Sequence, residues 1–142
     1  MMRVFLFEDD FAVRHAIEEW LERRGHEAVS YSHADSFCEH LETCPCGEGE
    51  TCGHQVLCDV RLPGKTGLQL MRELLAKGCK AEHMALMSGW WSPESLDEAG
   101  KLGVHMFKKP IDLGKILKWI EDCAEKVDEV RSAKVDHYRK SA

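Results

Sequence analysis

The fold is decided by residues 55–64, which read QVLCDVRLPG. The apolar run Val56 to Cys58 predicts a short buried strand that ends at Asp59, and Pro63-Gly64 then turns the backbone. In an open parallel α/β sheet, reactive groups lie where strands end, because a side chain there reaches solvent without breaking the hydrogen-bonded ladder. Asp59 is therefore a candidate for chemistry, although a lone acid after a strand is more often a turn former or a helix cap.

Three other predicted strands also end in polar residues. They are 4–7, followed by Glu8, Asp9 and Asp10; 84–87, followed by Ser88; and 104–107, followed by Lys108 and Lys109. If these strands run parallel to the Asp59 strand, their carboxyl ends bring acids, a hydroxyl and an ammonium group to one edge of the sheet.

These residue types together suit phosphoryl transfer. Neighbouring carboxylates repel one another unless a cation lies among them, and Mg²⁺ is usually held by one or two carboxylates with water and phosphate. Aspartate is a phosphoryl acceptor, while a lysine and a hydroxyl can hold the phosphoryl oxygens. The sequence therefore predicts Mg²⁺-assisted formation of an acyl phosphate on Asp59, with Ser88 and a lysine of the Lys108-Lys109 pair as the supporting groups.

Four motifs in this order resemble the receiver domain of two-component response regulators. They are FEDD at 7–10, CDVRLPG at 58–64, MSG at 87–89 and KKP at 108–110, and the resemblance covers about residues 3–127. It implies a flavodoxin-like (βα)5 fold, doubly wound, with five parallel strands in the order 2-1-3-4-5. By position, Asp59 matches the phosphorylated aspartate, Lys109 the lysine of the pattern and Ser88 the hydroxyl that moves toward the phosphate.

The same resemblance implies the metal ligands. Asp9 and Asp59 would bind Mg²⁺ directly, Glu8 through water, and Arg61 through its backbone carbonyl, while Asp10 would lie at a helix start. The chain departs from the family pattern at the switch position three residues before the lysine, which is usually aromatic and is Met106 here. Phe107 follows one residue later.

Strands and helices are expected to alternate along the chain. Apolar residues at helical spacing predict helices that end at Gly25 and by Gly78, and a strand is expected at 26–31. Further helices are expected over 34–41, over 93–102, and from an Asp112 cap to Val127. Short connections between such units predict right-handed crossovers with helices on both faces of the sheet.

Length and charge limit the function classes. A chain of 142 residues fits one domain, which we expect over 1–127. A polar tail follows at 128–142. We expect the tail either to fray into solvent or to act in homodimer formation or in docking to a partner. A net charge of −6 argues against direct DNA binding. No apolar run approaches the ~20 residues of a membrane span, so a cytoplasmic protein is expected. Beyond residue 127 there is no room for an output domain, so we expect a stand-alone receiver.

The connection at 43–54 is cysteine-rich and longer than the family usually has. Cys44, Cys46, Cys52 and His54 could bind zinc, with Cys38 or His40 as substitutes, although zinc sites favour two intervening residues and these pairs have one. A disulfide or redox role and a flexible, reduced loop are the alternatives. The remaining cysteines, Cys58, Cys79 and Cys123, are expected to be small buried hydrophobic residues.

Two adjacent tryptophans follow Ser88. One interpretation is that at least one of Trp90 and Trp91 anchors a partner or covers the site. The other is that one of them fills space above the following helix. Arg61 and Trp90 are large residues placed two positions after Asp59 and Ser88. We expect them to shield the acyl phosphate from water.

The predicted function is that of a signalling receiver and not of an enzyme acting on other molecules. A histidine kinase or phosphotransfer protein would phosphorylate Asp59, and the face formed by helix four, strand five and helix five would bind the next protein. One alternative is a receiver-fold module that works through a zinc-binding loop. Another is a Mg²⁺-dependent phosphatase with an aspartyl nucleophile, which would have a second acid where Arg61 stands.

Overall fold

The computed structural model describes residues 2–34 and 54–126. Its elements are β1 (Arg3–Phe7), α1 (Phe11–Arg23), β2 (Glu27–Tyr31), β3 (His54–Asp59), α2 (Gly67–Ala76), the 3₁₀ turn η3 (Ala81–His83), β4 (Met84–Ser88), α3 (Pro93–Leu102) and β5 (His105–Lys108). Residues 113–126 form a further helix, the 113–126 helix.

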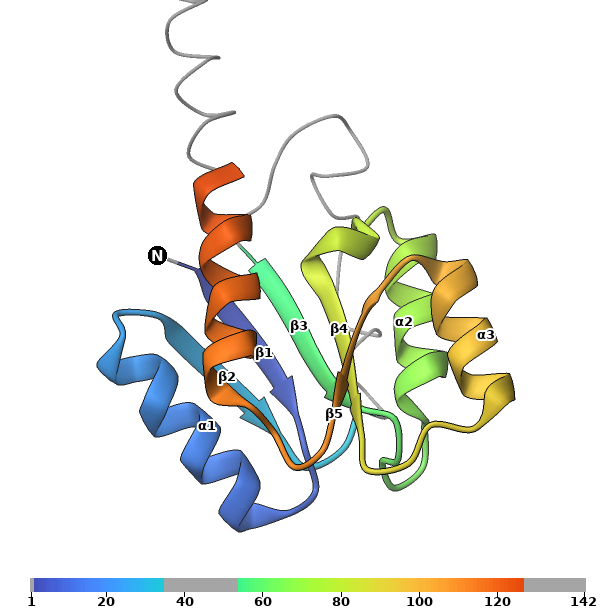
Figure 1. Ribbon diagram of the computed structural model, residues 1–142, viewed down its shortest axis with the longest axis horizontal. Helices are drawn as coiled ribbons and strands as arrows, with labels where there is room; N and C mark the ends of the chain where they lie inside the picture. The colour runs from blue at the N-terminus through green and yellow to red at the C-terminus, as the bar shows by residue number, and fades with distance from the viewer. Residues whose placement is uncertain (1, 35–53, 127–142) are drawn as a thin grey trace, which may run out of the picture.

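The five strands form one parallel sheet in the order β2-β1-β3-β4-β5 (Figure 1). This confirms the predicted fold class and strand order. The register places Phe7 beside Cys58, Asp59 beside Met87 and Ser88 beside Lys108. The strands therefore end together, and the residues that follow them meet at one edge of the sheet.

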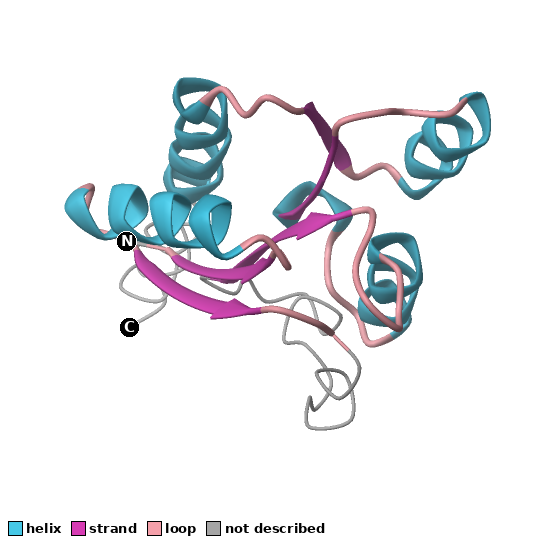
Figure 2. Ribbon diagram, turned by 90° about the horizontal axis from the view of Figure 1, so that it is seen from below, coloured by secondary structure: helices cyan, strands magenta, loops and turns pink. Residues whose placement is uncertain are grey.

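Helices cover both faces of the sheet. The α1 and 113–126 helices lie on one side, and α2 and α3 lie on the other (Figures 1 and 2). Two buried clusters match these layers, one built around α2 with Ala99 of α3 and the other around Ile17 of α1 and Ile116. The central strands β3 and β4 are buried almost throughout, as expected for strands covered on both faces.

Local sequence explains where the helices begin. Each first turn is capped by a side-chain oxygen that accepts a backbone N–H: Asp10 from Val13, Thr66 from Gln69, Ser92 from Ser95 and Asp112 from Lys115. The predicted helix at 93–102 is confirmed, with proline in its first turn and Gly103 at φ +76° after its last residue.

Several expectations fall outside the described residues. These are most of the helix expected over 34–41, the cysteine-rich connection except His54, and the tail at 128–142. The domain limits therefore stay predictions. Within the two described ranges, no helix has the length and apolar character needed to cross a bilayer.

Candidate functional site

The strand ends surround one open pocket of about 520 Å³. Glu8 and Asp9 follow β1, Asp59 ends β3, Ser88 ends β4 and Lys109 follows β5. Together with Arg61 these make up the full set of site residues predicted from the sequence, and all six line the pocket. The complete lining is Glu8, Asp9, Asp10, Asp59, Arg61, Ser88, Gly89, Trp90 and Lys109.

Three acids form a compact cluster in this pocket. One ligand atom from each of Glu8, Asp9 and Asp59 lies within 4.8 Å of the others. Glu8 and Asp59 are buried, whereas Asp9 is exposed. Oxygen ligands that converge from both a buried and a solvent-facing side fit a hard divalent cation that keeps part of its water shell, as Mg²⁺ does.

Lys109 supplies the positive charge opposite the acids. Its Nζ donates to Glu8 Oε2 at 2.8 Å and to Asp59 Oδ2 at 2.5 Å. Burial raises the pKa of Glu8, and the Lys109 hydrogen bond only partly offsets this. Burial also acts to lower the pKa of Lys109, but its hydrogen bonds and charge interactions with Asp59 and Glu8 outweigh that effect and raise it. The ammonium group therefore stays charged at neutral pH.

The Asp59 carboxylate and the Asp59 backbone carbonyl each have a close neighbour. Arg61 N–H donates to Asp59 Oδ1 at 3.0 Å, which leaves the other carboxylate oxygen to Lys109. At the start of α2, a Cβ at Gly67 would overlap the Asp59 carbonyl oxygen and come within 2.9 Å of the Leu86 side chain. Sequence reasoning missed Gly67, whose only signal was a glycine at the start of a helix that follows the Asp59 turn.

Arg14 supports the β1 end of the pocket. Its guanidinium donates to the Glu8 carbonyl oxygen at 2.7 Å and lies 5.6 Å from the centre of the Phe11 ring. Asp10, predicted to lie near a helix start, is the N-cap of α1, and the Asp10 backbone N–H donates to Glu8 Oε1 at 3.2 Å. The first turn of α1 therefore orients the Glu8 carboxylate toward the pocket.

Ser88 is buried, and its hydroxyl is occupied. Its Oγ donates to the Trp90 carbonyl at 2.7 Å and accepts the Trp90 N–H at 3.2 Å. The Ser88 carbonyl also accepts the Lys109 N–H at 2.8 Å. Ser88 thus connects the end of β4 both to the following loop and to the residue that carries the ammonium group.

The two tryptophans have different environments. Trp90 is 66% exposed and lines the pocket, whereas Trp91 packs against the α2 side of the core. The Trp91 indole N–H donates to the Phe107 carbonyl on β5 at 3.3 Å. Trp91 therefore has the packing role that was one of the two expectations, and Trp90 faces solvent beside the site, where a role as partner anchor or cover stays a prediction.

At the departure from the family pattern, Met106 is 41% exposed. Phe107 instead packs on the other face of the sheet, with its ring 5.9 Å from that of Trp119 in an edge-to-face arrangement. Neither residue lines the pocket that contains Asp59.

The zinc hypothesis is not supported. His54 begins β3, at the strand end away from Asp59, and its ring lies against Phe5, while the cysteines proposed as its fellow ligands lie outside the described residues. Of the other cysteines, Cys58 and Cys123 are buried as predicted and Cys79 is half-buried. Burial raises the pKa of the Cys58 thiol well above its usual range, which keeps it protonated and unreactive.

Many solved structures share this fold, among them the following two. A response regulator receiver protein from Pseudomonas putida is 26% identical, with a TM-score of 0.68 over 85% of this chain and 96% of that one. Full-length FixJ from B. japonicum is 24% identical, with a TM-score of 0.71 over 94% of this chain and 63% of that one.

Sequence comparison gives the family. The transcriptional regulatory protein FixJ of Azorhizobium caulinodans is 35% identical over 117 residues, which are 80% of this chain and 51% of that protein. The chain thus spans about half the length of this relative. A family model, the response regulator receiver domain, matches residues 4–121. With the strand order, this match shows that the chain belongs to the response regulator receiver domain family.

Proposed function

We propose that this receiver accepts a phosphoryl group on Asp59 from the phosphohistidine of a kinase or phosphotransfer protein. One observation carries the proposal: Lys109 joins buried Glu8 and Asp59 within an open pocket whose third acid, Asp9, faces solvent. The arrangement supplies a nucleophilic carboxylate, a fixed cation and room for a substrate, which are the components that phosphoryl transfer needs.

The transfer makes one bond and breaks one. An Asp59 carboxylate oxygen forms the new O–P bond, and the electron pair of the broken P–N bond returns to the donor imidazole. Lys109 stabilises the phosphoryl oxygens, and the Arg61 N–H holds the second Asp59 oxygen in place. Glu8, Asp9, Asp59 and the Arg61 carbonyl are the groups that would hold Mg²⁺, which supplies charge neutralisation between the carboxylates and the phosphoryl group.

The phosphoryl group then changes what Ser88 and Lys109 bind. Both groups can move toward the new anionic oxygens, which favours one of two arrangements of the loop after β4. The adjoining face of α3, β5 and the 113–126 helix is suited to a protein partner. A pocket of about 630 Å³ on the β5 and 113–126 helix part of this face includes exposed Met106, Lys108 and Lys115.

The partner class and location follow from the same chemistry. Phosphohistidine donors are the substrates, and a second protein, or a second copy of this chain, reads the change. A net charge of −6 gives no support for direct DNA binding. We place the activity in the cytoplasm, where kinases that make phosphohistidine have access to ATP.

Labelling by acetyl phosphate tests the proposal. The intact chain should gain one Mg²⁺-dependent, acid-stable and base-labile phosphoryl group, and Asp59→Asn should gain none. Asp97→Asn is the matched control, because Asp97 is an exposed α3 carboxylate paired with Lys101 outside the pocket. Undiminished labelling of Asp59→Asn, or labelling that needs no divalent cation, would contradict the assignment.

A further inference from the structure

The Ser88 hydroxyl has a single proton, and the Trp90 carbonyl already accepts it. A hydroxyl donates one hydrogen bond, so Ser88 cannot bind a phosphoryl oxygen without releasing that carbonyl. Because hydrogen bonds to an anion are roughly twice as strong as neutral ones, the exchange favours the phosphorylated state. Any restraint on the Trp90 backbone therefore controls how readily Ser88 responds.

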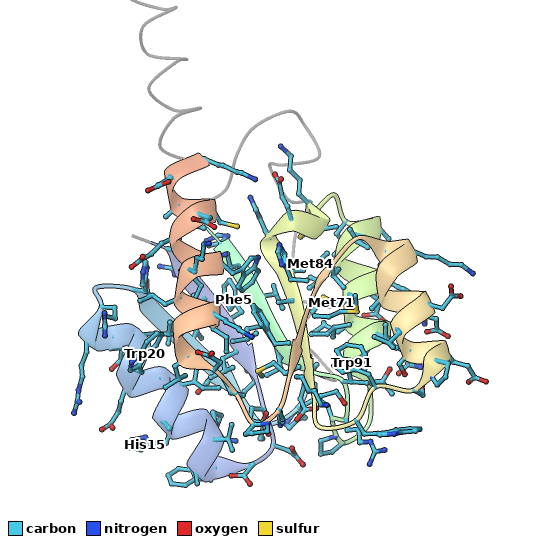
Figure 3. All side chains as sticks on the ribbon, in the orientation of Figure 1. Phe5, His15, Trp20, Met71, Met84 and Trp91 are labelled. Carbon is cyan, nitrogen blue, oxygen red and sulfur yellow. The ribbon has the colours of Figure 1, made fainter. Side chains whose placement is uncertain are left out.

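Trp91 provides such a restraint. It follows Trp90 directly, and its indole N–H is bound to the Phe107 carbonyl of β5. Its ring packs on the α2 side of the core, between the sheet and the helices α2 and α3 (Figure 3). One residue later, Ser92 caps α3. The loop is thus fixed to β4 at one end and to β5 and α3 at the other, with the Trp90 peptide between them.

The same contact leads to the proposed partner face. Phe107, whose carbonyl binds Trp91, places its ring against Trp119 of the 113–126 helix. Met106, at the position where the family usually has an aromatic residue, is 41% exposed and lies outside the Asp59 pocket. Backbone pairing joins Ser88 directly to Lys108 and Lys109. The Ser88 hydroxyl, by contrast, is connected to β5 through the tryptophan loop, and the side chain of residue 106 takes no part in that connection.

We propose that Trp91 is a positioning residue for Ser88. Its hydrogen bond to Phe107 stabilises the resting loop, in which Ser88 donates to Trp90, and links a change at Ser88 to β5 and α3. The inference rests on the proposed function, because it assumes that Asp59 carries the phosphoryl group. In this proposal the Trp91–Phe107 hydrogen bond stabilises the resting arrangement of the loop. Weakening that hydrogen bond should therefore shift the population toward the activated arrangement.

Trp91→Phe tests this role because it removes the indole N–H but keeps an aromatic ring. Beryllofluoride with Mg²⁺ serves as the probe for the phosphoryl group. We expect the variant to bind the probe about fivefold more tightly, the factor that corresponds to the ~1 kcal/mol of one neutral hydrogen bond. Before the probe is added, the backbone amides of residues 93–108 in Trp91→Phe should already exchange hydrogen with solvent at the rates seen in the probe-bound wild type. General structural damage would instead weaken binding.

Two matched controls accompany it. Met106→Leu alters the position of the family's switch residue, and Trp20→Phe removes an indole on α1, on the opposite side of the sheet from Trp91 (Figure 3). Both should respond to the probe as the wild type does. The proposal is overturned if Trp91→Phe binds the probe no more tightly than the wild type and its amides in 93–108 exchange hydrogen as in the wild type. It is also overturned if Met106→Leu loses the response to the probe.

A measurement on the wild-type chain covers the case in which Trp91→Phe does not fold. The four tryptophans give four indole N–H signals in a ¹⁵N-labelled sample. The probe should shift the Trp91 signal and leave that of Trp20 in place. A stationary Trp91 signal beside other shifted signals would refute the role of Trp91 alone. If no signal or amide responds to the probe, and Asp59→Asn behaves identically, the proposed function itself fails.

Discussion

Replacing Lys109 with methionine would test the charge balance of the pocket most directly. The substitution keeps an unbranched apolar stem and removes the ammonium group that lies 2.8 Å from Glu8 and 2.5 Å from Asp59. The side chains of Glu8 and Asp59 are only 1% and 9% exposed. The variant therefore retains two buried carboxylates that lack their cation and repel each other.

The expected loss of stability is about 2–3 kcal/mol at neutral pH without Mg²⁺. Removing one partner of a buried ion pair costs about 3–5 kcal/mol, and we reduce this because the Lys109 side chain is itself 23% exposed. The loss should shrink as the pH falls, because Glu8, whose pKa is raised by burial, takes up a proton and relieves the repulsion. Lys101→Met, which breaks an exposed pair with Asp97, should change stability by less than about 1 kcal/mol.

Urea unfolding followed by tryptophan fluorescence, with and without Mg²⁺, measures these differences. Mg²⁺ should stabilise Lys109→Met more than the wild type, because in the wild type the ammonium group competes for the same carboxylates. The reasoning is refuted if Lys109→Met unfolds at the wild-type urea concentration in Mg²⁺-free buffer. It is also refuted if Mg²⁺ stabilises both proteins equally.

Three more substitutions probe the surroundings of the site. Gly67→Ala should destabilise the fold by about 1–3 kcal/mol and slow acetyl phosphate labelling, because the added Cβ would overlap the backbone of Asp59. The control Gly100→Ala should do neither, because its Cβ would meet no atom within 4 Å. Burial lowers the pKa of His83, so wild-type stability should fall as the pH drops below about 6.5, where the unfolded chain takes up a proton before the folded one does. In His83→Gln the urea midpoint should depend less on pH. An identical pH dependence in the two proteins would count against this prediction. Arg61→Asn and Trp90→Ala should each shorten the lifetime of the acyl phosphate by opening the pocket to water, and unchanged hydrolysis rates would remove the shielding hypothesis.

The strand ends could be predicted because their signals are local. Each apolar run stops at a polar residue, and the order of the motifs restricts the topology to few arrangements. The helix caps follow the same logic, since Asp10 and Asp112 act on backbone groups three residues away. Neither prediction depends on distant parts of the chain.

Other features depend on how separate elements approach each other, and the sequence does not show this. Nothing beside Trp90 and Trp91 indicates which ring turns inward, because that depends on β5. The need for glycine at position 67 arises only when α2 packs against the end of β3. We expected Glu8 to act through water, but its carboxylate is buried against an ammonium group 101 positions later in the chain; the water-mediated metal contact remains a prediction.

That separation has a consequence for biosynthesis. Glu8 after β1 and Asp59 of β3 emerge from the ribosome long before Lys109, and the last strand at the edge of the sheet must dock before the ammonium group reaches them. Closing so long a loop is a late and costly event in folding. If the proposed function holds, a nascent or truncated chain that ends before β5 should be inert toward phosphohistidine, so competence to accept the phosphoryl group would require that β5 has been made and has docked.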